Sequence, residues 1–308
     1  MKFPSRRTRR AVTPKRRPAR LLLEPLEGRQ LLSGFGPEDG AFIVEPWSGR
    51  YAAVQIQPGD QKIVAAGGTS SGLAVARYDS AGNADLSYGT GGRSTPTGGG
   101  AAGSLVLQPD GKAVVSRSDN FGVGRLNPNG SLDKTFDSDG WASINVNSLT
   151  SQLARGVGLQ SNGQIVVGGQ AGNVLSPSAV LGGFKTNGAV NSGKGGFGQI
   201  VGGKAIGYTV DKFGGQVARF SSLEVQSDNK IVALGEFNAD ARVVGQVLLA
   251  RYTANGVLDT TLNGTGYTIL TLPRISYTSM LRLRHRPRRP AIRWEDRRSE
   301  YLSGRPGR

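Results

Sequence analysis

The chain has 308 residues and a mass of 32.3 kDa, enough for one large domain or two ordinary ones. Glycine contributes 47 residues, cysteine none, and histidine one, His285, which lies in an arginine-rich tail. This composition excludes disulfides, thiolate nucleophiles, cysteine-ligated zinc and clustered histidines. The high glycine content favours thin elements joined by many turns over helical bundles.

The formal net charge of +16 resides in the two ends of the chain. Residues 1–20 contain nine basic residues and no acids, and residues 281–308 contain ten arginines and three acids. The stretch between them, 21–280, has nineteen basic and nineteen acidic residues. A nucleic-acid-binding domain carries its basic residues on the folded surface, so we predict no nucleic-acid partner for this stretch. Binding of nucleic acid through the basic ends is kept as a weaker alternative.

Residues 1–33 form a basic leader. Its apolar stretch, 21–23, is too short for the core of an ordinary signal peptide, and the sequence predicts no membrane span. The segment 23–33, LEPLEGRQLLS, resembles the LEPR-x-LL segment at the start of planctomycete surface proteins, with 26–28 inserted before the arginine. The resemblance implies an extracellular or cell-surface protein. The alternative is a disordered basic leader with no role in export.

Residues 34–272 contain a phrase repeated four times: an apolar strand, a polar turn and a β-branched run. A second phrase follows each time and runs into a three-residue turn whose third residue is glycine. That turn is typical of a hairpin, because glycine adopts the left-handed conformation that the third position requires. The copies of the first phrase are 53–68, 105–115, 157–169 and 223–235; the turn glycines are Gly82, Gly130, Gly188 and Gly256.

The second hairpin predicts its own side-chain partners. Residues equidistant from the turn centre face each other, so three of the four copies bring an arginine opposite an aspartate. In the third copy Gly183 and Asn191 take these two places, so the charge is lost from both partners together. We interpret the pairs as structural, worth roughly 0.2–1 kcal/mol each. They are Arg77 with Asp85, Arg125 with Asp133, and Arg251 with Asp259.

Two hairpins per copy, at spacings of 50, 52 and 66 residues, are typical of β-propeller blades. A β-solenoid is the alternative, although its repeats are usually shorter. The phrases resemble the delta-60 repeat, a propeller-like family of bacterial, often exported proteins, over 34–272. No catalytic residues are established for that family, so the resemblance implies none. We therefore predict an all-β, β-propeller-like array of about four four-stranded blades, incomplete or open and marginally stable, with disordered basic ends.

The tail, 273–308, is rich in arginine and unlike the repeats. It is either a solvated basic arm or a fifth repeat read out of frame. The second hypothesis comes from the genetic code: shifted by one nucleotide, the codons for 283–301 are compatible with another copy of the first phrase. The lysine of that copy would fall at Glu295, 65 residues after Lys230. Resequencing the gene at codons 270–283 tests this hypothesis.

Ligand contacts are expected where the copies deviate from one another, because insertions in repeat proteins lie on one face. The extra residues lie near 171–178 and 237–245. The alternative at both places is a longer solvated loop with no role in ligand binding. The polar candidates for ligand binding are Glu236, Asn238, Asp240 and Arg242.

No motif specifies a reaction. The glycine-rich stretch 193–204 lacks the strand–helix context and the final Ser/Thr of a nucleotide-binding loop, and 137–140 lacks the further ligands of a calcium loop. We therefore predict no catalytic residue, no metal and no cofactor. The function that the sequence favours is a non-enzymatic interaction or structural scaffold whose partner is a protein or glycan at the cell surface. The alternative is a propeller-type hydrolase acting on a carbohydrate or lactone.

Overall fold

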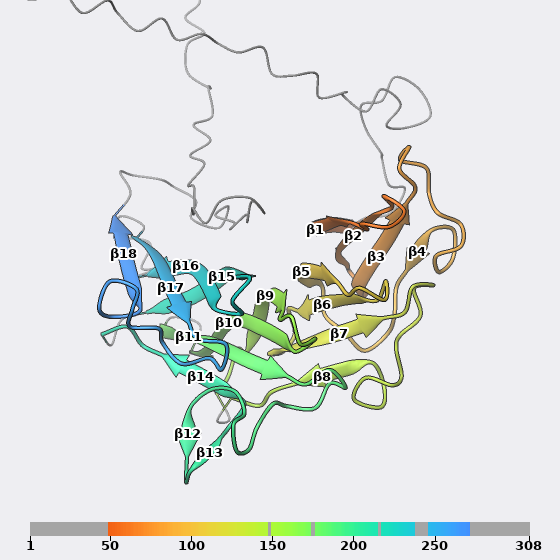
Figure 1. Ribbon diagram of the computed structural model, residues 1–308. Helices are drawn as coiled ribbons and strands as arrows, with labels where there is room; N and C mark the ends of the chain where they lie inside the picture. Colours follow the sequence, from red (N-terminus) through yellow and green to blue (C-terminus); the bar gives the residue numbers. More distant parts are fainter. Residues whose placement is uncertain (1–48, 147–148, 174–175, 215–216, 238–245, 272–308) are drawn as a thin grey trace, which may run out of the picture.

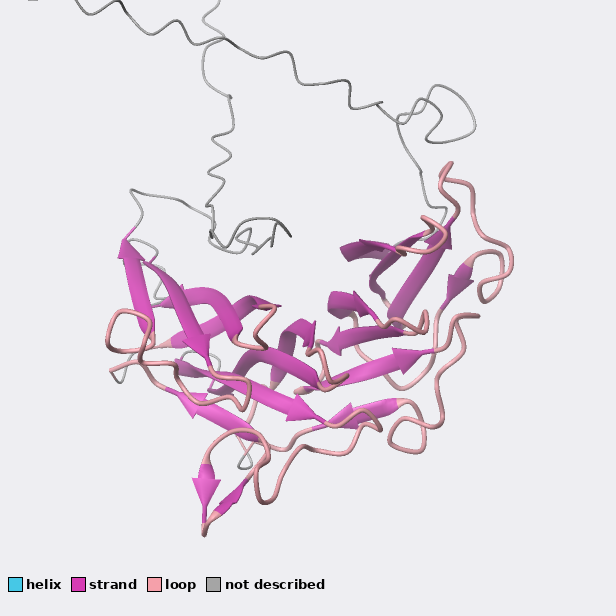
Figure 2. Ribbon diagram, viewed as in Figure 1, coloured by secondary structure: helices cyan, strands magenta, loops and turns pink. Residues whose placement is uncertain are grey.

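The computed structural model (Figure 1) describes residues 49–146, 149–173, 176–214, 217–237 and 246–271. Within these ranges the chain forms strands and turns and contains no helix (Figure 2), so this part has no helix that could span a membrane. The leader 1–33 and the tail 273–308 lie outside the described residues, so the expectations for both ends remain predictions.

Four antiparallel sheets of four strands follow one another along the chain, and we call them blades one to four. Blade one contains β1 (Gly49–Ile56), β2 (Ile63–Thr69), β3 (Gly72–Tyr78) and β4 (Arg93–Ser94). Blade two contains β5 (Ala102–Leu107), β6 (Ala113–Arg117), β7 (Gly122–Leu126) and β8 (Trp141–Ser143). Blade three contains β9 (Leu153–Leu159), β10 (Ile165–Asn173), β11 (Ser176–Phe184) and β14 (Tyr208–Asp211). Blade four contains β15 (Ala218–Val225), β16 (Ile231–Phe237), β17 (Gln246–Tyr252) and β18 (Tyr267–Thr271).

The turn after the third strand of each blade has the predicted glycine in the left-handed conformation, with φ between 74° and 93°. The strand that leaves this turn is shorter than a hairpin requires. In blade one it forms a single bridge, Tyr78 to Ala84, before the chain turns away and pairs again with β3 at Arg93 and Ser94. The fourth strand is therefore separated from the tight turn by a loop, and the second hairpin is only partly formed.

The additional residues of blade three form strand rather than loop. Residues 171–173 and 176–178 extend β10 and β11 and pair with each other in register. A small separate hairpin, β12 (Ile200–Val201) with β13 (Lys204–Ala205), lies between β11 and β14 and accounts for much of the longest spacing. The sequence did not predict this hairpin.

The first strand of every blade carries a β-bulge near its start. The bulges lie between Tyr51 and Ala53, Ala102 and Leu105, Ala154 and Gly156, and Phe220 and Ser222. A bulge bends its strand and increases the local twist. Repetition of the bulge shows that the four sheets are copies of one unit down to the backbone.

Most of the core lies in layers between neighbouring blades, since the three largest apolar clusters each draw on two adjacent sheets. Sheets can pack this closely because small residues face large ones: a Cβ added at Gly158 of β9 would lie 2.7 Å from Cδ1 of Leu223 of β15. The middle strands are consequently buried on both faces, as in β6 and β7. The blades follow an open arc in which blade one and blade four lie at opposite ends (Figure 1). The fold is an open, all-β propeller, as predicted.

Candidate functional site

The charged residues of the repeats form one small cluster per blade. In blade two, Asp133 Oδ2 lies 2.7 Å from Nε of Arg125 and 3.1 Å from Nζ of Lys112. Blade one has the same arrangement: Asp85 lies 2.7 Å from Arg77 and 3.0 Å from Lys62. In blade four Asp259 lies 2.8 Å from Arg251 and 3.0 Å from Lys230. Each aspartate thus meets two cations, where the sequence predicted only the arginine.

Blade three replaces the whole cluster with neutral groups. The amide of Asn191 donates to Oε1 of Gln164 over 3.2 Å, in the place of the aspartate–lysine contact. Gly183 stands where the arginine would be, and the ring of Phe197 fills the space: a Cβ added at Gly183 would lie 2.5 Å from Cγ of Phe197. The three substitutions preserve packing and hydrogen bonding without charge, which supports a structural role for the clusters.

The clusters are poorly suited to acid–base catalysis. Burial on its own raises the pKa of Asp133, but hydrogen bonds from Thr135 and Lys112 and the charge of Arg125 hold that pKa well below its ordinary value. The same balance lowers the pKa of Asp85 and Asp259. A general acid in glycoside hydrolysis needs the opposite shift, a raised pKa.

The predicted ligand-binding residues are only partly described. Glu236 lies in β16, is 8% exposed and accepts a hydrogen bond of 2.6 Å from Nε of Arg219 on the neighbouring β15. Partial burial and the nearby charge of Arg219 lower the pKa of Arg155, so two guanidinium groups lie around one carboxylate there. Asn238, Asp240 and Arg242 lie outside the described residues, and their role remains a prediction.

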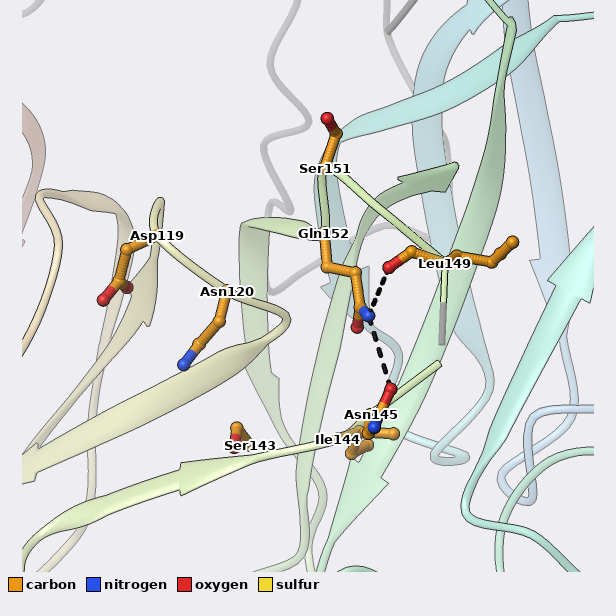
Figure 3. Close-up of a pocket in the computed structure, with 8 residues that line it drawn as sticks. All are labelled: Asp119, Asn120, Ser143, Ile144, Asn145, Leu149, Ser151 and Gln152. Atoms are coloured by element: carbon orange, nitrogen blue, oxygen red, sulfur yellow. Dashed lines mark hydrogen bonds between the residues drawn. The ribbon is translucent and has the colours of Figure 1, made fainter. Parts of the chain in front are cut away.

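A polar pocket with a volume of about 370 Å³ opens between blades two and three (Figure 3). Three segments supply its walls: the β6–β7 turn, the end of β8, and the connection from β8 to β9. None of the predicted ligand-binding residues lines it. The lining residues are Asp119, Asn120, Ser143, Ile144, Asn145, Leu149, Ser151 and Gln152.

One wall of the pocket is fixed by Gln152. Its Nε2 donates to the carbonyl of Leu149 over 2.6 Å, and its Oε1 accepts from the backbone N–H of Val146 over 3.0 Å. The same Nε2 lies 3.5 Å from Oδ1 of Asn145, as Figure 3 shows. The side chain therefore ties the two ends of the connecting loop together.

The opposite wall carries Asp119 and Asn120. Asp119 accepts two hydrogen bonds from Arg117, of 3.0 and 2.7 Å, and Arg117 stacks on Trp141. Burial raises the pKa of Asp119, but Arg117 outweighs it and lowers the pKa overall. Asn120 Oδ1 is buried and has no hydrogen-bond partner among the described residues. A buried amide oxygen without a partner is costly. This oxygen is fully buried, so a ligand in the pocket reaches it only if the Asn120 side chain turns.

The pocket is chemically a hydrogen-bonding site. It presents amides, hydroxyls and one ion-paired carboxylate, which suit a polar ligand of low charge. The described residues contain no group of three or more His, Cys, Asp or Glu side chains that could hold a metal. The repeat pattern could not reveal this site, because its residues come from a turn and a strand end of blade two and from the connection to blade three, outside the repeated phrases. The one sequence signal is the run of polar residues that ends at Gln152.

Comparison with known proteins agrees with the geometry. Residues 108–136 and 226–262 match the model of a domain of unknown function (DUF5122) described as a beta-propeller. The chain is a β-propeller repeat protein. The matched residues lie in blades two and four, whose charged clusters are complete. No curated protein matches the chain.

Solved structures with a similar backbone fold include two whose sequence identity to this chain is very low. A catalytically inactive virginiamycin B lyase from Staphylococcus aureus with quinupristin is 9% identical, with a TM-score of 0.40; the alignment covers 78% of this chain and 75% of the lyase. A protein of unknown function from Bacteroides caccae is 13% identical, with a TM-score of 0.39, over 74% and 73% of the two chains. Likenesses at this level say nothing about activity.

Proposed function

We propose that this propeller is a non-enzymatic interaction scaffold of the cell exterior that binds a glycan in the polar pocket between blades two and three. The observation that carries the proposal is the set of amide and hydroxyl side chains around that pocket. A sugar hydroxyl can donate to side-chain oxygens of this set and accept from its amide and hydroxyl donors.

The non-enzymatic part of the proposal rests on the carboxylates. The aspartates of the charged clusters and Asp119 have lowered pKa values, so they stay ionised at neutral pH. Glu236 is paired with Arg219. A glycoside hydrolase instead needs one carboxyl group kept protonated beside a second, ionised one. Burial raises the pKa of Asp211, but this residue is bonded to the Tyr252 hydroxyl and does not line the pocket.

Export rests on the sequence. The LEPR-x-LL-like segment 23–33 and the delta-60-like phrases support a surface location. Fractionation of cells of the source organism, probed with an antibody against the propeller, tests it: the protein is expected in the surface or extracellular fraction. Recovery in the cytosol alone would contradict export.

Binding is tested with the full chain on an array of bacterial surface glycans. We expect a small set of neutral or weakly charged glycans to bind, and Asn120→Ala to weaken binding about tenfold, the loss expected for one buried hydrogen-bonding group. Asn83→Ala, in an exposed turn of blade one, is the matched control and should bind like the wild type. Equal binding by Asn120→Ala would exclude the pocket as the binding site.

The hydrolase alternative is tested on the glycans that bind and on a panel of lactones. We expect no turnover. Hydrolysis that disappears in Asp119→Asn would replace the scaffold proposal with an enzyme at the same pocket.

A further inference from the structure

Neighbouring blades are joined by a junction that is built three times on the same pattern, with a glutamine as the side-chain donor in the third. In each junction the first residue of the glycine-containing turn accepts a hydrogen bond through its carbonyl from a side chain of the preceding blade. The accepting carbonyls and their donors are Pro128 with Arg77, Thr186 with Arg125 and Ala254 with Gln160.

The next carbonyl of the same turn is used as well. It accepts from a backbone N–H at the aromatic corner of the preceding blade, at 2.8–2.9 Å in all three junctions. These accepting carbonyls and donors are Asn129 with Gly89, Asn187 with Asp137 and Asn255 with Gly198.

An apolar side chain on the first strand completes each junction by packing on the preceding blade. Leu105, Val157 and Leu223 occupy this position in blades two, three and four and are 2%, 3% and 6% exposed. The strand registers place Val54 at the same position of blade one. Val54 is 59% exposed, and its neighbour Ile56 is 57% exposed.

Blade one therefore presents the receiving half of a junction without an occupant. The carbonyls of its turn, at Ser80 and Ala81, accept no hydrogen bond from any described residue. Its apolar strand position faces solvent. All three receiving contacts are free together, which is expected only if the whole junction is missing.

Blade four presents the donating half. Arg251 keeps its bonds to Asp259 and Thr261, but its Nη1 has no acceptor among the described residues. Its side chain is 22% exposed, against 8% for Arg77 and 7% for Arg125, whose Nη1 atoms reach the following blade. The forward face of β16 and β17 carries an apolar cluster whose described members all belong to blade four.

We propose that two copies of this chain assemble head to tail, with blade four of each copy docked on blade one of the other. The same chain supplies both halves of the junction, so a second copy fits the free halves as blade two fits blade one. Four blades from each copy make a ring of eight, within the ~4–8 blades of closed propellers. Because the contact is heterologous, closure after two copies gives a discrete dimer with two identical junctions.

Docking requires a local rearrangement on the side of blade four. The four cluster residues there are at most 7% exposed in the single chain, whereas Val54 and Ile56 are open. Association that waits on such a change is slow. The dimer is therefore expected to form more slowly than one made by two open surfaces.

The test is the mass of the purified full chain, by light scattering and by sedimentation over a concentration series. We expect a species of twice 32.3 kDa that dissociates on dilution. Val54→Asp should raise the dissociation constant at least about tenfold, because it places a charge in a packed apolar position. Val257→Asp is the control: Val257 is 53% exposed and lies outside the proposed junction, so this variant should dimerise like the wild type.

Folding of both variants is checked by circular dichroism, and both substitutions are at exposed positions, so the single chain should remain folded. A wild-type chain that stays at 32.3 kDa at hundreds of micromolar would overturn the proposal. An open series of larger species would overturn the closed ring, and equal dimerisation of the wild type and Val54→Asp would exclude this face. None of these results depends on glycan binding, so the two proposals fail separately.

Discussion

Arg125 donates from Nε to Oδ2 of Asp133 over 2.7 Å, and both side chains are almost fully buried, at 7% and 3% exposed. The two residues are eight positions apart and face each other beyond the turn that contains Gly130. The Arg125 guanidinium also lies over the ring of Phe136, 4.4 Å from its centroid, and donates to the carbonyl of Thr186 in blade three. One pair thus fixes the turn within a blade and reaches the next blade.

Asp133→Asn should destabilise the protein strongly, because it leaves Arg125 and Lys112 without their buried counter-charge. Removal of one partner of a buried ion pair costs about 3 kcal/mol. Chemical denaturation of the full chain, followed by fluorescence and circular dichroism, measures the change. A loss near zero would show that solvent or another group already compensates the two cations.

The pH dependence follows from the lowered pKa of Asp85, Asp133 and Asp259. A carboxyl group whose pKa is lower in the folded state stabilises the fold above its unfolded pKa of about 4, and this stabilisation fades as pH falls below that value. We expect the free energy of unfolding to decrease from pH 5 to pH 2, with a shallower decrease in Asp133→Asn. An unfolding free energy that rises in this window would contradict the assignment.

Asp211 should behave in the opposite way. Burial raises the pKa of Asp211, although its hydrogen bond of 2.7 Å from the Tyr252 hydroxyl partly offsets this. Burial destabilises the ionised form of Asp211, and a neutral asparagine does not carry this cost. Asp211→Asn should therefore leave the unfolding free energy at pH 7 unchanged or raise it. The measurement is the same denaturation experiment, and a loss as large as that of Asp133→Asn would contradict the prediction.

The neutral cluster of blade three predicts an asymmetry between blades. Gly183→Arg restores the residue type of the other copies, but the ring of Phe197 already occupies that space, so we expect a loss of about 1–3 kcal/mol from overpacking. Gly59→Ala is the control, because a Cβ there meets nothing within 4 Å. Gly183→Arg at wild-type stability would mean that Phe197 can move aside freely.

Much of the blade could be predicted from sequence because its information is local. The hairpin turn and the facing of Arg125 and Asp133 follow from the position of one glycine. The bridging of Asp133 by Lys112 was not predicted, although the joint loss of lysine, arginine and aspartate in the third copy signalled it. The sequence did not predict that the second hairpin is only partly formed, because the length of its strands is set by packing between sheets.

The pocket could not be predicted for a different reason. Asn120 lies in the β6–β7 turn of blade two and Gln152 in the connection from β8 to β9, and neither segment belongs to the repeated phrases. Their proximity depends on the path of that connection, and no periodicity within a single repeat encodes it. The same holds for β12 and β13, a hairpin found in one blade only.

The central claim is that one four-stranded unit, held by its own arginine–aspartate pair, is repeated along the chain. A double-mutant cycle on Arg125→Met and Asp133→Asn, measured by denaturation of the full chain at pH 7, tests it most directly. We predict a coupling of at least about 1 kcal/mol between the two positions, as expected for residues in direct contact. Losses that simply add would show that the two side chains do not meet, and the repeated unit described here would be wrong.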